Sequence, residues 1–413
     1  MTLKNFDELL KKYAELLVAT GINVQKGHSV VLSIDVDQAP LARLITEAAY
    51  KRGAKKVIVK WADQATSRLD YEYQDLDTLT DIPQYIIDES ETLVAEGASR
   101  ISVRSTDPDG FAGIDPKKLA ETAKATGAAL KNQREATQAN RVSWLVAAAA
   151  GEKWAAKVFP DLESSAEQVD ALWDAIFKAV HLYEDDPIAY WDKKVENLQN
   201  KANQLNEYAF DALHYKAPGT DLVLGLPKNH LFEGAGSTNA RGEIFVANMP
   251  TEEVFSAPDR NRVDGVVVST KPLSYAGTII EDMEFHFKDG QVVKATAKRG
   301  EKVLKDLIAQ DEGSCRLGEV ALVPDESPIS QSGLTFFNTL FDENASNHLA
   351  LGSAYAFSVK GGTEMSQEEL KEAGLNRSNA HVDFMIGSDQ MDIDGIKEDG
   401  TRIPVFRNGT WAF

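Results

Sequence analysis

The first half of the chain alternates short apolar runs with amphipathic stretches. Residues 29–34 form an apolar run rich in β-branched residues, which predicts a buried strand. Apolar residues then recur at helical spacing from Pro40 until Gly53 ends the stretch. Residues 56–61 form the next predicted strand, and the short helical crossover implies that the two strands are parallel. The same alternation predicts helices at 6–19, 84–97 and 116–126 and a strand at 101–103.

A helical region and a strong breaker follow. Helical patterns dominate residues 152–215, and apolar residues from Val195 to Ala212 recur at spacings of three and four, which predicts one long helix. The sequence Ala-Pro-Gly-Thr at 217–220 then interrupts the pattern. We therefore expect an N-terminal α/β domain over residues 1–215 and a C-terminal domain over residues 216–413.

The second half is rich in strand patterns. Lys288-Asp289-Gly290 is typical of a hairpin turn between two of its strands, and an alanine-rich helix is expected after Asp342. The overall prediction is a mixed α/β protein, in which a domain of βαβ units precedes a strand-rich α+β domain. The expected strands of the second half are 222–226, 243–247, 265–270, 278–287, 291–297 and 316–323.

Composition and charge narrow the classes of function. The 413 residues carry a formal net charge of −20, which disfavours binding to phosphate backbones and anionic lipid. The most apolar stretch, residues 142–150, is too short to span a bilayer, and the acidic N-terminus lacks the apolar run of a signal peptide. We expect a cytoplasmic protein that binds neither nucleic acid nor membrane. The single cysteine, Cys315, excludes a disulfide framework or a thiolate zinc site within one chain.

A histidine and an aspartate share one face of a predicted strand near the C-terminus. In residues 380–386, His381 and Asp383 alternate with the apolar Val382 and Phe384. Two such side chains on a rigid strand can chelate one metal ion. A purely structural contact between the histidine and the carboxylate is the alternative reading.

Four further residues could complete a site. Residues 347–355 read as a helix, which would place His348 and Tyr355 on one helix face two turns apart, although an ordinary packed helix would show the same pattern. Glu319 interrupts an apolar strand, and burying it without a cation would be costly. Glu253 follows Asn248-Met249-Pro250, and each of the two glutamates, taken alone, is more readily explained as a solvated surface charge. Together these groups offer nitrogen and oxygen ligands that suit two zinc, cobalt or manganese ions.

The candidate residues lie in four segments that occur in order along the chain. The segments are NMPTEEVF (248–255), LGEVALV (317–323), NTLFDENASNHLALGSAY (338–355) and NRSNAHVDFMIG (376–387). They resemble the metal-site motifs of the aminopeptidase T / aminopeptidase S / PepS family of dinuclear metallo-aminopeptidases. The resemblance extends over essentially the whole chain, including its α/β first half.

The resemblance implies a site and an activity. Its ligands would be Glu253, Glu319, His348, His381 and Asp383, which bind two divalent cations per subunit with Tyr355 beside them. Zinc is the ion we expect first, with cobalt, manganese or magnesium as alternatives. The family also implies a cytoplasmic homodimer with an internal cavity, which acts on peptides with a free N-terminus.

The mechanism follows as a hypothesis. Two cations about 3.5–4 Å apart would share a carboxylate, either Glu319 or Glu253, and activate a water that attacks the first peptide carbonyl. Tyr355 would stabilise the oxyanion, and Glu319 would carry the proton to the leaving amine. The alternatives are a non-catalytic metal- or peptide-binding protein on the same scaffold and a different two-metal hydrolase such as a phosphoesterase.

Overall fold

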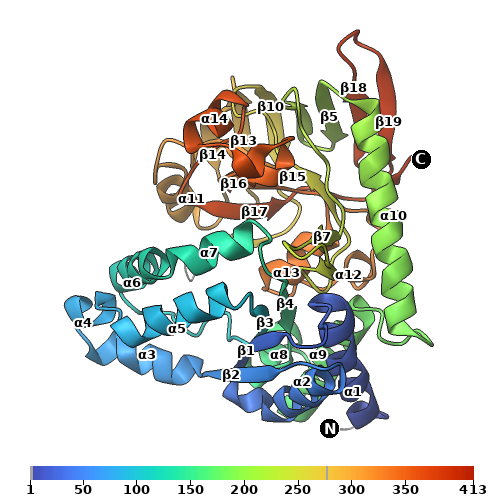
Figure 1. Ribbon diagram of the computed structural model, residues 1–413. Coiled ribbons are helices and arrows are strands. Elements are labelled where there is room, and N and C mark those ends of the chain that lie inside the picture. The colour runs from blue at the N-terminus through green and yellow to red at the C-terminus, as the bar shows by residue number, and fades with distance from the viewer. Residues whose placement is uncertain (1–2, 276–277) are drawn as a thin grey trace. The chain divides into compact units, whose positions relative to one another are not determined.

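The computed structural model describes residues 3–275 and 278–413, which divide into two compact units (Figure 1). The first unit comprises residues 1–193 and 236–250, and the second comprises residues 194–235 and 251–413. The predicted boundary at 215/216 falls inside strand β5 (Ala212–Ala217), and the units instead divide within helix α10 (Pro187–Tyr208). No helix among the described residues is long and apolar enough to cross a membrane.

The first unit contains a four-stranded parallel sheet in the order β2-β1-β3-β4. Strand β1 (Ser29–Asp35) is central and largely buried, which explains its continuous apolar sequence. It pairs in parallel with β2 (Lys56–Ala62), as the short crossover predicts, and with β3 (Ser99–Arg104). Strand β4 (Trp144–Ala148) lies beyond β3.

Helices connect and flank these strands in the sequence. Helix α2 (Ala39–Lys51) is the crossover between β1 and β2, and its Pro40 lies in the first turn, as expected. The other helices of the unit are α1 (Phe6–Leu16), α3 (Gln64–Tyr73), α4 (Leu76–Thr80), α5 (Gln84–Ala95), α6 (Pro116–Ala129), α7 (Lys131–Gln138), α8 (Glu152–Val158) and α9 (Ser165–Ala179). A hairpin of β7 (Gly236–Thr238) and β8 (Ile244–Val246) belongs to the same unit.

The second unit contains an eight-stranded antiparallel sheet and a four-stranded antiparallel sheet. The larger sheet has the order β14-β13-β10-β6-β5-β18-β19-β20, and β13 and β14 form the hairpin predicted around Lys288-Asp289-Gly290. Its strands besides β5 are β6 (Thr220–Gly225), β10 (Val263–Val268), β13 (Glu284–Lys288), β14 (Gln291–Thr296), β18 (Asp392–Ile396), β19 (Arg402–Arg407) and β20 (Thr410–Trp411).

The smaller sheet has the order β17-β16-β15-β9 and packs one face on the core of the unit. Its strands are β9 (Val254–Ser256), β15 (Leu317–Leu322), β16 (His348–Gly352) and β17 (His381–Met385). The rings of Phe384 on β17 and Phe285 on β13 lie 4.7 Å apart, so side chains of both sheets meet in one core. The remaining elements are β11 (Leu273–Tyr275), β12 (Thr278–Ile280), α11 (Glu301–Ile308), α12 (Pro328–Gln331), α13 (Thr339–Asp342) and α14 (Gln367–Glu372).

Three predicted elements differ from the structure. The predicted helix at 347–355 is wrong, because residues 348–352 form the buried strand β16 and Tyr355 lies beyond its end. The predicted helix through Ala212 stops at Tyr208, and Ala212 begins β5. The predicted strand at 278–287 is two strands, separated at Asp282, whose φ is 52°.

Candidate metal centre

Five of the candidate side chains come together on one face of the smaller sheet. On β16 and β17, His348, His381 and Asp383 alternate with Leu349, Leu351 and Phe384, which belong to the core on the opposite face. The period-2 pattern predicted for His381 and Asp383 is therefore confirmed. Glu319 on β15 and Glu253, directly before β9, lie beside them.

A β-bulge turns Glu319 toward this face. Leu317 pairs with Leu351 and Glu319 pairs with Ala350, so the register shifts by one residue between them. Leu317 consequently packs in the core, whereas Glu319, two residues later, points to the other side. Gly318 makes this possible because a Cβ at that position would lie 2.3 Å from the carbonyl oxygen of Gly352.

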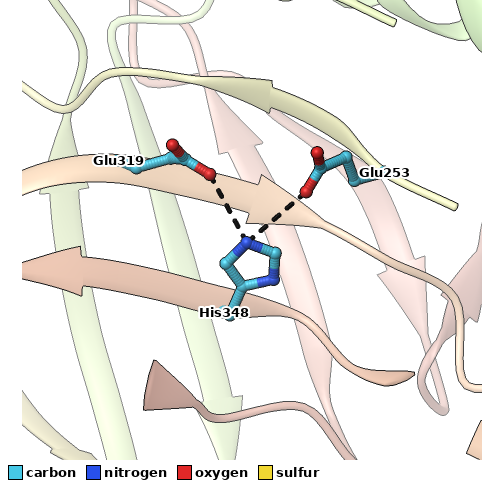
Figure 2. A group of neighbouring side chains, drawn as sticks. All are labelled: Glu253, Glu319 and His348. Atoms are coloured by element: carbon cyan, nitrogen blue, oxygen red, sulfur yellow. Dashed lines mark ion pairs between the residues drawn. The ribbon is translucent and has the colours of Figure 1, made fainter. Parts of the chain in front are cut away.

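The first group of candidate ligands surrounds the imidazole of His348. Figure 2 shows Glu253 and Glu319 pointing at the same ring nitrogen. The Nε2 atom of His348 lies 3.5 Å from Glu253 Oε2 and 3.4 Å from Glu319 Oε1. All three side chains are buried.

The second group shares Glu319 with the first. The Nε2 atom of His381 lies 3.3 Å from Glu319 Oε2 and 3.6 Å from Asp383 Oδ1. Each carboxylate oxygen of Glu319 thus faces a different histidine. Within each group, one ligand atom per residue lies within 4.8 Å of the others.

Backbone carbonyl groups orient both imidazoles. The Nδ1 atom of His381 lies 2.7 Å from the carbonyl oxygen of Ser353, and the Nδ1 atom of His348 lies 3.2 Å from that of Ser346. A proton held on Nδ1 by these carbonyls leaves Nε2 free to bind a metal ion. Histidine ligands in metal sites are commonly held in this way.

Burial and mutual charge shift the pKa values of the group. Burial alone would lower the pKa of each histidine, but the hydrogen bonds to Glu319 and the surrounding carboxylates raise the pKa of His348 and His381 to about 10. Burial would raise the pKa of Glu319, yet the two imidazoles hold it at about 2. Burial dominates at Glu253 and raises its pKa to about 7.

Tyr355 reaches the site from a different element than expected. It lies after β16, directly before a 3-10 turn at residues 356–358. Its ring lies 5.1 Å from that of His381 and stacks on that of Phe357 at 5.2 Å. Burial and the neighbouring carboxylates raise the pKa of Tyr355 well above its ordinary range, so its hydroxyl remains a proton donor.

A fourth carboxylic acid beside the site, Glu343, was not predicted from the sequence. It begins a short 3-10 turn between α13 and β16. Burial and the charges of Asp383 and Glu253 raise its pKa well above the ordinary value, which places it within electrostatic reach of the cluster. Its carboxylate has no hydrogen bond or ion pair with any residue of 3–275 or 278–413. The sequence Asp-Glu-Asn at 342–344 is typical of the start of a helix. A strand follows instead, and this difference, which points to Glu343, is visible only in the structure.

The chain segment that carries Glu253 is anchored by its neighbour Glu252. The backbone N–H of Glu252 donates to Asn344 Oδ1 at 2.8 Å, and its carboxylate accepts from Lys194 Nζ of α10 at 2.6 Å. This ion pair is buried, with side-chain exposures of 11% and 8%. Helix α10 and the 3-10 turn of Glu343 therefore both hold the start of β9.

The donor set fits divalent cations. Two imidazole nitrogens and carboxylates without thiolate are the ligands that zinc, cobalt and manganese accept. Such a concentration of buried carboxylates also needs positive charge, because unpaired buried carboxylates are costly. The residues present thus fit a metal centre that Glu253, Glu319, His348, His381 and Asp383 would hold.

The chain belongs to a known family of metalloproteases. The family described as thermophilic metalloprotease (M29) matches residues 6–411, which is nearly the whole chain. The family resemblance of the four motifs is therefore confirmed.

The individual relatives include named aminopeptidases. Aminopeptidase PepS of Streptococcus thermophilus is 59% identical over 412 residues, with all of both chains covered, and aminopeptidase AmpS of Bacillus subtilis is 51% identical over 409 residues, with 99% and 100% covered. Among solved structures, wild-type AmpT from Thermus thermophilus superposes with a TM-score of 0.93 at 41% identity, covering 99% of this chain and 100% of that one. The mixed α/β fold is thereby confirmed.

Proposed function

We propose that this chain is a metal-dependent aminopeptidase, which removes the N-terminal residue of peptides with water activated at a site for two divalent cations. The observation that carries the proposal is the shared carboxylate. Glu319 belongs to both candidate ligand groups and turns one oxygen to each histidine. Between the two carboxylates considered as a bridge, this arrangement favours Glu319 over Glu253.

The bound cations would supply Lewis acidity and a water that ionises near neutral pH. The chain's own residues have distinct tasks around them. Glu253, Glu319 and His348 would hold one cation, and Glu319, His381 and Asp383 would hold the other. Because both oxygens of Glu319 would bind cations and its pKa is held at about 2, Glu319 is a weak acceptor for the proton that the attacking water loses. The protonated hydroxyl of Tyr355 would donate a hydrogen bond to the carbonyl oxygen as its charge develops.

Glu343 is the candidate for recognition of the free N-terminus. An aminopeptidase needs a group that binds the α-ammonium of its substrate, and a spare carboxylate beside the metal ligands provides one. Glu343 lies within electrostatic reach of the cluster and has no partner among the described residues. A Glu343→Gln variant should therefore raise KM for unblocked substrates while keeping its metal ions.

Substitution of the shared ligand tests the proposed site. Purified wild-type protein and Glu319→Gln are stripped with a chelator, reloaded with zinc or cobalt, and assayed for bound metal and for cleavage of an aminoacyl anilide. We expect two ions per subunit and cleavage in the wild type, with both reduced in the variant. Unchanged metal content and activity in Glu319→Gln would refute the assignment.

Several finer properties remain part of the proposal. The ions are expected to be zinc, with cobalt, manganese or magnesium as alternatives, and the enzyme is expected to be a cytoplasmic homodimer. The relatives named aminopeptidases support the activity over a non-catalytic metal- or peptide-binding protein. A phosphoesterase is disfavoured because a negatively charged protein repels phosphate substrates.

A further inference from the structure

A glutamate one strand beyond the metal centre lies on the same face of the smaller sheet. Glu233 and Phe255 of β9 exchange both backbone hydrogen bonds, at 2.9 and 3.0 Å, so they are directly opposed residues of an antiparallel pair. Side chains of such a pair project to the same side. Their chain neighbours Phe232 and Val254 are core residues, so Glu233 and Phe255 point away from the core.

The register places this pair in line with the metal ligands. Phe255 pairs with Ala321 of β15, and Ala321 pairs with His348 of β16. The row therefore runs Glu233, Phe255, Ala321 and His348 across neighbouring strands. Three strand spacings of about 4.8 Å separate the backbones of Glu233 and His348 by about 14 Å. A long substrate side chain and a glutamate that extend toward each other can bridge this span.

Aromatic rings lie between the glutamate and the metal centre. The ring of Phe255 lies 6.2 Å from that of Tyr355 and 6.0 Å from that of Phe357, and Tyr355 in turn contacts His381. Phe255 and Phe357 are only partly buried, so parts of these rings are open to contact. Aromatic faces bind the methylene stems and charged heads of arginine and lysine.

The backbone that carries Glu233 is firmly held. Asn206 of α10 accepts from the Phe232 N–H at 2.8 Å and donates to the Phe232 carbonyl at 3.0 Å. Ser256 Oγ donates to the carbonyl of Leu231 at 2.8 Å. A substrate-binding group on such a segment would be in place before the substrate arrives, which reduces the ordering cost of binding.

The carboxylate of Glu233 has no ionic partner in the described part of the chain. It makes no hydrogen bond or ion pair with residues 3–275 or 278–413, and burial raises its pKa. A partly buried carboxylate without a partner is unfavourable by itself. A cation brought by a ligand would relieve this cost, whereas an apolar ligand would increase it.

We propose that Glu233 is a specificity-determining residue, which selects peptides whose N-terminal residue has a cationic side chain. The stem of an N-terminal lysine or arginine would pass along Phe255 and Phe357, and its charge would meet the carboxylate of Glu233. The inference rests on the proposed aminopeptidase function and names the preferred substrate class of the same site.

The test compares substrates that differ only in charge. Lysyl and norleucyl p-nitroanilides have side chains of similar length, and arginyl p-nitroanilide is a second cationic substrate. For the metal-loaded full-length enzyme, Glu233→Gln should lower kcat/KM for the lysyl and arginyl substrates by about ten- to a hundredfold, chiefly through KM. The norleucyl substrate should change by less than about twofold, because it makes no charged hydrogen bond.

Two variants complete the experiment. Glu233→Lys should reverse the preference and increase cleavage of glutamyl p-nitroanilide relative to the lysyl substrate. Glu398→Gln, at an exposed position of the same unit, is the control for charge alone and should leave all ratios unchanged.

Two results would overturn the assignment. One is an equal loss on charged and neutral substrates in Glu233→Gln, which would indicate a structural role or binding of the α-ammonium. The other is an unchanged ratio of lysyl to norleucyl cleavage. Absence of wild-type cleavage of every unblocked anilide would instead refute the proposed function.

Discussion

At the residue scale, Glu319 occupies a position that few carboxylates in a folded protein could tolerate. It is 5% exposed on a central strand, and its charge is balanced by two imidazoles. Charged groups so deeply buried require partners or a metal ion. The sheet itself is stabilised by the apolar residues of its opposite face. Replacement of Glu319 is therefore expected to change the chemistry of the site more than the packing of the sheet.

Removal of single candidate ligands should abolish activity without unfolding the chain. We expect His381→Ala and Glu319→Ala to reduce peptide hydrolysis by more than about a thousandfold, since both groups are proposed to hold the catalytic ions. Circular dichroism and size-exclusion profiles should match those of the wild type. Full activity in either metal-reconstituted variant would contradict the site assignment.

Protons and metal ions should compete for the same groups. In the metal-free protein, the pKa of His348 and His381 is raised from 6.5 to about 10, so these histidines stabilise the fold fully below about pH 6.5 and lose that contribution as the pH rises toward 10. The raised pKa of Glu253 acts in the same direction between about pH 4.5 and 7.

The midpoint temperature of thermal unfolding of the chelated protein should consequently decrease as the pH is raised from 6.5 to 10. Zinc-loaded protein should lose this dependence, and zinc binding at pH 7 should release protons, which calorimetry in buffers of different ionisation enthalpy can count. The double variant His348→Gln/His381→Gln is the control, because it should lack the slope. An increase of the midpoint temperature of the chelated protein over this pH range would contradict the raised pKa values of the two histidines.

Sequence reasoning named five of the candidate side chains that the structure brings together, but it did not name Glu343. The alternation around His381 was readable because a strand imposes a period of two. The position of Glu343 near Asp383 and Glu253 could not be predicted from the sequence, because it depends on a 3-10 turn that no local pattern specifies. The choice of Glu319 as the shared carboxylate likewise required the spatial register of three strands.

At the element scale, the bulge in β15 connects backbone geometry with chemistry. Substitution Gly318→Ala would place a Cβ 2.3 Å from the Gly352 carbonyl oxygen, so the two strands must separate. We expect a loss of about 1–3 kcal/mol of stability together with weaker metal binding, because Glu319 is displaced.

Denaturant unfolding and metal titration check this expectation. Gly127→Ala, within helix α6, is the matched control and should gain about 0.5–1 kcal/mol, since alanine favours a helix and meets only a flexible arginine side chain at 3.3 Å. A Gly318→Ala protein with wild-type stability and metal affinity would show that the bulge does not control Glu319.

Helix α10 should contribute to the site through one ion pair. Lys194→Ala removes a buried ion-pair partner of the Glu252 carboxylate, beside the candidate ligand Glu253. We expect about 3 kcal/mol of destabilisation and reduced metal affinity. Lys51→Ala breaks the exposed pair with Glu47 and should leave the stability nearly unchanged, because solvent screens this pair. Equal effects of both variants in urea unfolding would refute the role assigned to Lys194.

The errors at this scale have a common physical origin. Residues 347–355 are rich in alanine and leucine, which favour a helix locally, yet β16 is a central strand buried on both faces. Tertiary pairing with β15 and β17 overrides that propensity. In the same way, the apolar spacing through Ala212 continues past the helix because β5 begins with buried residues of its own.

At the scale of the whole molecule, fold class and family were predictable, whereas the division into units was not. The βαβ pattern of the first half and the strand-rich second half are both present. Residues 236–250, however, belong to the first compact unit although they follow the breaker at 217–220. The local composition of these residues does not differ in a way that would assign them to the first unit.

The charge of the molecule also gains a more specific meaning. A net charge of −20 suits substrates with a free ammonium group, since the field of the protein attracts cations. Few of the acidic residues take part directly. Glu253, Glu319 and Asp383 are candidate ligands, whereas Glu343 and Glu233 are candidates for substrate recognition.

The metal dependence of cleavage, measured on a matched pair of substrates, tests the proposed aminopeptidase function. The zinc- or cobalt-loaded protein is incubated with leucyl p-nitroanilide and with its N-acetylated counterpart, before and after chelation and metal re-addition. We expect cleavage of the unblocked substrate alone, loss of that cleavage on chelation, and its recovery when the metal is added again. Cleavage of the acetylated substrate, or cleavage of the unblocked one that persists in the fully chelated protein, would contradict the proposed function.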